Sequence, residues 1–108
     1  MYVRINCVAE LKGSQRKYLR GLAHKLNPSA YVGQKGLTES LMDEIDAALD
    51  AAELIKIKFI DHKDKEIKTA LTEEIVSRSH AHLAGMIGHV AILYRQHAKP
   101  EKRQIKLP

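Results

Sequence analysis

The chain has 108 residues, enough for one domain with one core, and its 44% hydrophobic and 29% charged residues are typical of a soluble globular protein. No apolar run approaches the roughly 18 residues that a membrane-spanning helix needs, and residues 1–9 lack the features of a secretory signal. A single cysteine, Cys7, excludes an internal disulfide and a cysteine-based metal site, so we expect a cytoplasmic protein.

The charges are segregated along the chain, with a formal net charge of +5 at pH 7. Residues 1–35 contain seven Lys or Arg and one acid, residues 36–53 contain six acids and no base, and residues 95–108 contain five bases and one acid. Such segregation is typical of proteins that bind polyanions. A soluble protein that happens to be basic would show it too.

The first predicted helix runs from an N-cap at Ser14 to about Leu26, where Asn27-Pro28 ends it. Helical spacing directs four apolar residues to the core: Leu19, Leu22, Ala23 and Leu26. A separate stripe is basic and contains Arg16, Lys17, Arg20 and His24. A plain solvated face is the usual explanation of such a stripe, but no acid lies between residues 12 and 36. Gly21 costs about 1 kcal/mol relative to Ala inside a helix, which a close packing contact would explain.

A short strand at residues 30–32 leads into the loop Gly33-Gln34-Lys35-Gly36, and Thr38 caps a second helix that reaches about residue 52. This helix is amphipathic, with acids on its outer face and an inner stripe made of Leu41, Ile45, Ala48, Leu49 and Ala52. Residues 54–60 then alternate as a half-buried strand, with Ile55, Ile57 and Phe59 on one face and Lys56 and Lys58 on the other.

Asp64 can cap a third helix to about residue 79, whose inward residues would be Ile67, Ala70, Leu71 and Ile75. Residues 83–87 and 90–94 flank Gly88-His89, which predicts a type II′ hairpin. Residues 96–108 show no periodicity and are expected to form an irregular basic tail. The element order α-β-α-β-α-β-β predicts a compact two-layer α/β domain, with a four-stranded mixed sheet packed by three helices.

The glycine loop suits an RNA backbone. Glycines at both ends permit positive φ angles and let a phosphodiester approach without a Cβ in the way, while Lys35 adds a cation at the tip. The helix that opens at Thr38 presents a positive dipole end. This is the logic of the GXXG clamp of KH-type RNA-binding domains. A strand-to-helix turn also uses glycine for geometry alone, so the loop by itself is a weak signal.

Four linked motifs in order carry a resemblance to a known family. They are Leu22-Ala23-His24, the segment from Val32 to Glu39, the segment from Glu53 to Lys58, and Ile87-Gly88 with Leu93-Tyr94-Arg95. From about Leu11 to Arg95 the chain resembles the YhbY family, the stand-alone bacterial form of the CRM (chloroplast RNA splicing and ribosome maturation) domain.

The resemblance implies a fold like the C-terminal domain of a translation initiation factor, and RNA binding in precursors of the large ribosomal subunit. It divides the chain into an N-terminal lead (1–10), an RNA-binding domain (11–95) and a basic tail (96–108). The expected RNA-binding residues are Arg16, Lys17, Arg20, His24, Gly33, Gln34, Lys35, Gly36 and Arg95. Tail bases such as Lys99, Lys102, Arg103 and Lys106 could fold onto RNA or merely solvate the tail.

Other functions have weaker support. A protein-interaction module that joins pre-ribosomal particles through its acidic second helix is the main alternative. A metal site built from His80, His82 and His89 lacks an acidic or thiol ligand, so we expect no metal, no cofactor, no small-molecule substrate and no enzymatic activity. For Tyr94 we expect packing at a sheet edge with its hydroxyl in water, rather than a base-stacking role.

Overall fold

The computed structural model describes residues 11–61 and 64–105, and its elements follow the expected order. The first three are helix α1 (Gly13–Ala23), strand β1 (Ala30–Val32) and helix α2 (Glu39–Ala52). Strand β2 (Leu54–Phe59) and helix α3 (Lys65–Ser79) come next. The hairpin strands β3 (His82–Ile87) and β4 (Val90–Tyr94) precede a single 3₁₀ turn, η1 (Pro100–Lys102).

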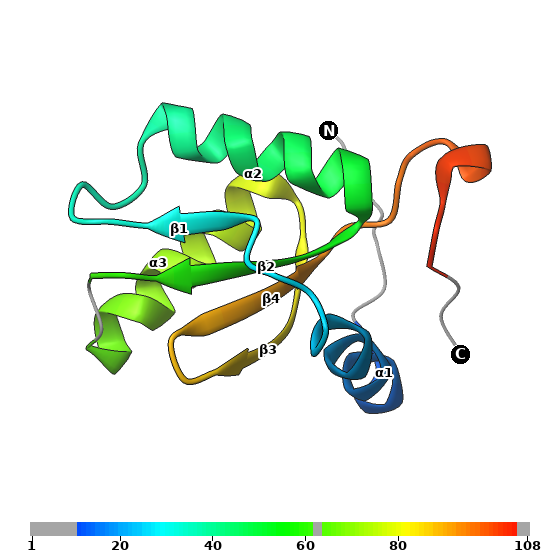
Figure 1. The fold of residues 1–108 in the computed structure, drawn as a ribbon, viewed down its shortest axis with the longest axis horizontal. Helices are drawn as coiled ribbons and strands as arrows, with labels where there is room; N and C mark the ends of the chain where they lie inside the picture. The colour runs from blue at the N-terminus through cyan, green and yellow to red at the C-terminus, as the bar shows by residue number, and fades with distance from the viewer. Residues whose placement is uncertain (1–10, 62–63, 106–108) are drawn as a thin grey trace.

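The four strands form one mixed sheet in the order β1-β2-β4-β3 (Figure 1). Strand β1 pairs with β2 in parallel, and β4 is antiparallel to both β2 and β3. The two-residue hairpin turn follows the prediction, because Gly88 has a φ of 59° and His89 has no positive φ. The compact α/β domain with a mixed sheet and three helices is therefore confirmed.

Helices α2 and α3 cover one face of the sheet, and α3 lies behind the sheet in Figure 1. The alternation of β2 places Ile55, Ile57 and Phe59 in this larger core, as expected. Helix α2 contributes Leu41, Ile45 and Leu49, and Thr38 caps it by accepting a hydrogen bond from the Leu41 N–H at 3.1 Å. Most of the apolar residues that the sequence assigns to the core are in this cluster.

Helix α1 packs against the opposite face of the sheet, so helices lie on both faces and the expected arrangement in two layers is wrong. Its buried residues Leu19 and Ala23 meet Leu54, Ile92 and Tyr94 in a second, smaller cluster. In Figure 1, α1 lies at one end of the sheet, beyond the start of β2. The part of this face nearer the other end carries no helix among the described elements.

The expected bounds and buried face of α1 were partly wrong. Its N-cap is Lys12 rather than Ser14, since the Gln15 side chain accepts a hydrogen bond from the Lys12 N–H at 2.9 Å. The helix ends at Ala23, and Leu22 and Leu26 are 40% and 39% exposed instead of buried. Lys56 Nζ donates to Leu26 O at 3.0 Å and to His24 O at 3.4 Å. A cation from the sheet thus satisfies carbonyls at the end of α1, which terminates it earlier than the sequence predicts.

The inner face of α3 is more polar than the apolar spacing predicts. Ile75 is buried and Leu71 half-buried, but Ile67 and Ala70 are exposed. Lys68, Thr72 and Ser79 are buried in their place. Lys68 Nζ donates to Gly88 O at 2.8 Å and lies 3.1 Å from His89 Nδ1, so this lysine holds the hairpin turn against the helix. Because the ammonium group of Lys68 has these partners, a charged residue can occupy a buried position of α3.

The described part of the tail contains one 3₁₀ turn and is otherwise irregular, as expected. It is nevertheless attached to the domain, because it returns to Glu53. This residue has a φ of 64° and a fully buried side chain, whereas the sequence placed it among the exposed acids of the second helix. Its carboxylate accepts N–H hydrogen bonds from His97 at 2.7 Å, Gln104 at 2.6 Å and Ile105 at 2.9 Å. The buried charge is satisfied by backbone dipoles, and it fixes residues 96–105 to the junction of α2 and β2.

The pH dependence of stability is expected to report on Glu53. Burial by itself raises the pKa of this carboxyl. The three backbone N–H donors and nearby His97 lower the pKa by more than burial raises it, so the pKa lies below the ordinary 4.5. A lowered pKa stabilises the fold above the ordinary value, and this stability is lost as pH falls through the folded pKa. Glu53→Gln should cost about 1–3 kcal/mol at neutral pH. Urea unfolding should also show a smaller loss of stability for the variant than for the parent between neutral pH and about pH 4. Equal losses in both proteins would contradict this role.

Gly21 has no structural requirement, contrary to the close contact we expected. A Cβ at Gly21 would meet nothing within 4 Å, and the residue is exposed within α1. Gly21→Ala should therefore raise the free energy of unfolding by about 0.5–1 kcal/mol, because Ala loses less backbone entropy in a helix. Urea denaturation measures the change. As a contrast, Gly85→Ala should destabilise, since its Cβ would lie 2.5 Å from Arg20 Cδ.

Candidate functional site

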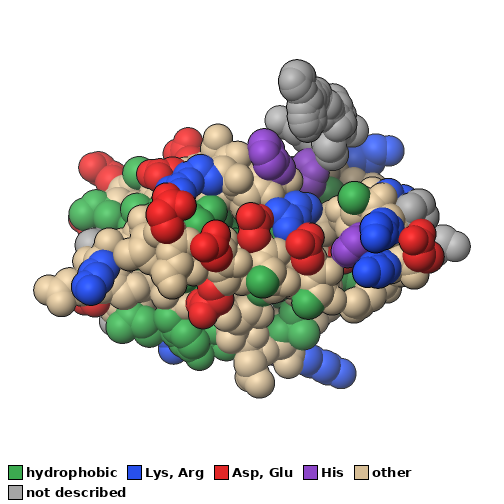
Figure 2. Space-filling view, turned by 90° about the horizontal axis from the view of Figure 1, so that it is seen from above, with side chains coloured by type: hydrophobic (Ala, Val, Ile, Leu, Met, Phe, Trp, Pro, Cys, Tyr) green, Lys and Arg blue, Asp and Glu red, His purple; other side chains and the backbone are tan. Residues whose placement is uncertain are grey.

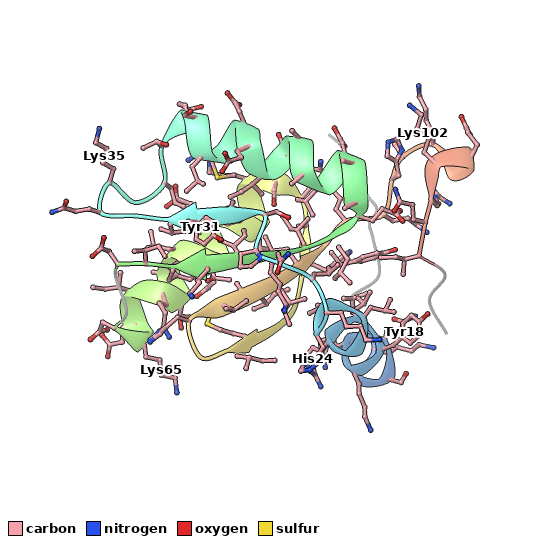
Figure 3. The ribbon with its side chains drawn as sticks, in the orientation of Figure 1. Tyr18, His24, Tyr31, Lys35, Lys65 and Lys102 are labelled. Atoms are coloured by element: carbon pink, nitrogen blue, oxygen red, sulfur yellow. The ribbon has the colours of Figure 1, made fainter. Side chains whose placement is uncertain are left out.

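The glycine loop forms a tight turn between β1 and α2. The Gly36 N–H donates to Gly33 O at 3.0 Å, and Gly36 has a φ of 70°. Gly33 does not adopt a positive φ, so the expectation of two left-handed glycines holds only at Gly36. A Cβ at Gly33 would meet nothing within 4 Å, which leaves its backbone open to approach. Gln34 and Lys35 are exposed, and Figure 3 shows Lys35 projecting from this end of the molecule.

The four residues of the predicted basic stripe on α1 differ in their availability. Arg16 Nη1 donates to Leu11 O at 2.6 Å, although the residue remains exposed, and Lys17 and His24 are also exposed. Arg20 Nη1 instead donates to Ala84 O at 3.1 Å, and its aliphatic stem covers Gly85. Arg20 therefore fastens α1 to β3, while the other three residues face solvent.

Arg95 also has structural partners. Its guanidinium pairs with the carboxylates of Asp46 at 2.7 Å and Asp50 at 3.0 Å, and it donates to Ser79 O at 2.7 Å. These contacts join the end of β4 to α2 and to the end of α3. All of them compete with a phosphate for the same donors, so the structure favours a structural role over the RNA contact that we expected.

The glycine turn and the basic face of α1 are not adjacent. In Figure 3, Lys35 lies at the upper left end of the molecule, whereas His24 and Tyr18 lie low in the view, from its centre to the right. The longest extent of the molecule is 37 Å. Lys35 and the basic face of α1 therefore cannot both contact one short stretch of RNA backbone, which the sequence alone would allow. The reason is topological: β1 begins beside the end of α1 and leads away from it to the turn.

The open part of the sheet lies between these two regions. One register row crosses all four strands there, from Tyr31 to Lys58, Val90 and Ile87. Tyr31 is 52% exposed and Ile87 is 62% exposed, and Lys58 is also exposed. Sequence reasoning missed Tyr31, because a three-residue strand is too short to show which face its middle residue occupies.

An acidic surface covers another side of the molecule. Figure 2 shows carboxylates gathered along α2, where the exposed acids are Glu39, Asp43, Glu44, Asp46 and Asp50. Arg78 of α3 pairs with Glu39 at 2.9 Å and with Glu74 at 3.3 Å. Together with Arg95, this arginine neutralises part of the surface, and Asp43 and Glu44 have no ion pair within the described ranges.

A groove of about 530 Å³ between α3 and β3 does not suit a phosphate, because it is mainly apolar, with Val76, Leu83 and Met86 in its lining. In residues 11–61 and 64–105, no group of three His, Cys, Asp or Glu side chains is placed to hold a metal ion. The described helices also include none with the length and apolar character to span a membrane.

Tyr94 is buried rather than placed at the edge with its hydroxyl in water. Its ring stacks on His82, with centroids 6.5 Å apart and an interplanar angle of 26°. Its Oη is buried and has no hydrogen-bond partner in the described part of the chain. Burial and the nearby charge of Glu53 raise the pKa of Tyr94. The expectation that Tyr94 packs rather than stacks on a base agrees with this burial.

Comparison with known proteins places the whole described domain in one family. The model of the CRS1/YhbY (CRM) domain family matches residues 11–95. A Haemophilus influenzae protein named "RNA-binding protein" is 41% identical over 91% of this chain and 95% of its own length. The Bacillus subtilis "Probable RNA-binding protein YqeI" is 35% identical over 91% and 99%. The solution structure of SAV1595 from Staphylococcus aureus superposes with a TM-score of 0.76 and 31% identity, covering 91% of this chain and 99% of that one.

The unpartnered hydroxyl of Tyr94 gives a direct test of the buried arrangement. Tyr94→Phe removes a polar atom that makes no hydrogen bond to the described residues and keeps the ring that packs against His82. The free energy of unfolding should stay the same or rise by up to about 1 kcal/mol, because burying an unsatisfied hydroxyl costs free energy. Thermal and urea unfolding measure it, and a loss of more than about 1 kcal/mol would show that the hydroxyl has a partner.

Proposed function

The chain belongs to the CRS1/YhbY (CRM) domain family, and we propose that it is a non-enzymatic RNA-binding protein that grips the RNA backbone at two separate places. The observation that carries the proposal is its match, over 91% of its length, to a relative whose name is "RNA-binding protein". The geometry supports the proposal because exposed cations stand at two well-separated places, outside the acidic surface of α2.

The first contact is the turn of residues 33–36. Gly33 lets a phosphate approach the backbone, and Lys35 supplies a cation that pairs with no acid of the described residues. Arg78 reduces the repulsion from Glu39 at the start of α2, since it pairs with that carboxylate. A phosphate seated here would be held by a backbone without side chains in the way and by one mobile charge, as in a GXXG clamp.

The second contact is the exposed basic face of α1, made of Arg16, Lys17 and His24. Arg20 and Arg95 are left out because their guanidinium groups hold the fold together. Since the two contacts are well separated, the RNA passes along the open sheet face between them and meets each contact with different phosphates. The acidic surface of α2 repels RNA from the remaining side.

The proposed target is rRNA in precursors of the large ribosomal subunit, bound in the cytoplasm. Support comes from the resemblance of the four linked sequence motifs to the YhbY family, which implies this assembly role. Crosslinking in cells, followed by sequencing of the attached RNA, tests the target. Recovery of tRNA or messenger RNA instead of rRNA would contradict it. Co-sedimentation with pre-ribosomes without any RNA crosslink would favour docking through the acidic helix.

Reversing the charge of the turn should remove the first contact. The double variant Gln34→Asp, Lys35→Asp is expected to weaken binding of an rRNA fragment by at least about tenfold at physiological salt, because it replaces one attraction by two repulsions. It should also lower the slope of log affinity against log salt by about one. Electrophoretic mobility shifts at several salt concentrations measure both effects.

A matched control separates this local effect from the change in net charge. Ala47→Glu, Ala70→Glu and Ser77→Glu together lower the net charge by three, as the turn variant does, but at exposed helical positions of α2 and α3. This control should weaken binding much less than the turn variant does. Equal loss in both variants, or unchanged affinity in the turn variant, would show that the turn is not the contact.

A further inference from the structure

The open sheet face carries a row of side chains that has no part in the proposed binding of the RNA backbone. Tyr31, Lys58, Val90 and Ile87 follow one another across the four strands in a single register row. Residues that are neighbours in such a row have Cβ atoms about 5 Å apart, so these side chains form one continuous strip. Helix α1 covers only the other end of this face. The strip therefore meets solvent next to the turn that carries Lys35.

The chemistry of the strip suits a flat, negatively charged ligand. Tyr31 presents a half-exposed ring and Ile87 a 62% exposed side chain, so the strip offers apolar surface that folding leaves unburied. Lys58 lies directly beside Tyr31 on the neighbouring strand and has no ion pair among the described side chains. The nearest acid along this strand, Asp61, lies beyond the end of β2 and is exposed.

We propose that Tyr31 is a stacking platform for an unpaired RNA base, with the adjoining phosphate at Lys58. This inference rests on the proposed RNA binding and specifies the class of RNA. The bases of an A-form duplex are stacked on one another and hidden from a side chain, whereas an unpaired base can lie flat on an aromatic ring. The protein therefore selects RNA that exposes a single-stranded segment between the phosphates held by the turn and by α1.

Of the three tyrosines in the described residues, Tyr31 is the best placed for this role. Tyr94 is buried against His82, and Tyr18 lies on α1, well separated from Lys35. Figure 3 shows Tyr31 on β1, on the route from the turn to α1. A ring on a rigid strand loses little conformational freedom when a base stacks on it, because the backbone is already fixed by pairing with β2.

The experiment compares oligouridine of about ten nucleotides with an abasic ribose-phosphate oligomer of the same length. Tyr31→Leu should weaken binding of oligouridine by about 5- to 100-fold, and Tyr31→Phe should bind like the parent, because the ring is retained. The abasic oligomer should bind the parent and Tyr31→Leu equally. The salt slope should not change in Tyr31→Leu, since no phosphate contact is removed. Ile67→Ala removes exposed apolar surface from α3 and serves as the control.

Several outcomes overturn the stacking role. They are equal oligouridine binding by Tyr31→Leu and the parent, an equal loss with the abasic oligomer, and failure of the parent to bind oligouridine while it binds duplex RNA. The turn variant keeps this test distinct from that of the proposed function. If the turn variant loses affinity and Tyr31→Leu does not, RNA binding stands and the platform fails. If neither loses affinity, the proposed backbone grip fails too. Thermal unfolding of each variant confirms that the fold is retained.

Discussion

The attachment of α1 to one end of the sheet determines which surfaces this domain presents. Arg20 lies across Gly85, where a side chain would leave no room, and donates to Ala84 O. The pairing of β3 with β4 shifts register between Leu83 and Gly85, so the attachment site is an irregular point of the edge strand. From the other side, Lys56 holds the carbonyls at the end of α1. These contacts keep α1 over the smaller core and leave the strip at Tyr31 open.

Buried charges act as joints between segments in the rest of the fold. Glu53 holds the returning chain of residues 96–105, and Lys68 holds the hairpin turn. Both find their main partners in backbone groups rather than in an opposite charge. A buried charge is costly without such partners, so each joint strongly specifies the segment that supplies them. Leucine and isoleucine side chains dominate the helix-sheet contacts, and these polar joints add directional restraint that the apolar contacts lack.

Local pattern predicted most of the elements but not the contacts between distant segments. The alternation of β2, the caps at Thr38 and Asp64, and the Gly88-His89 turn are properties of a few neighbouring residues, and all are found in the structure. The early end of α1, the polar inner face of α3 and the burial of Glu53 depend on partners supplied by other segments. Arg20 shows this best, because its acceptor lies 64 residues away and the sequence offers only a basic residue on a helix.

In the binding mode that we propose, two separated basic regions recognise RNA by a different principle from one continuous cradle. Cations on well-separated parts of a molecule 37 Å long cannot neutralise the same phosphate, so each region alone binds weakly. An RNA that reaches both regions binds the second as an intramolecular step, and its affinity depends on whether its shape spans the distance. A fixed spacing on a rigid sheet therefore selects RNA by geometry without reading its sequence. A ring between the two regions adds a further requirement, since only an RNA with an unpaired base at that point satisfies all three contacts.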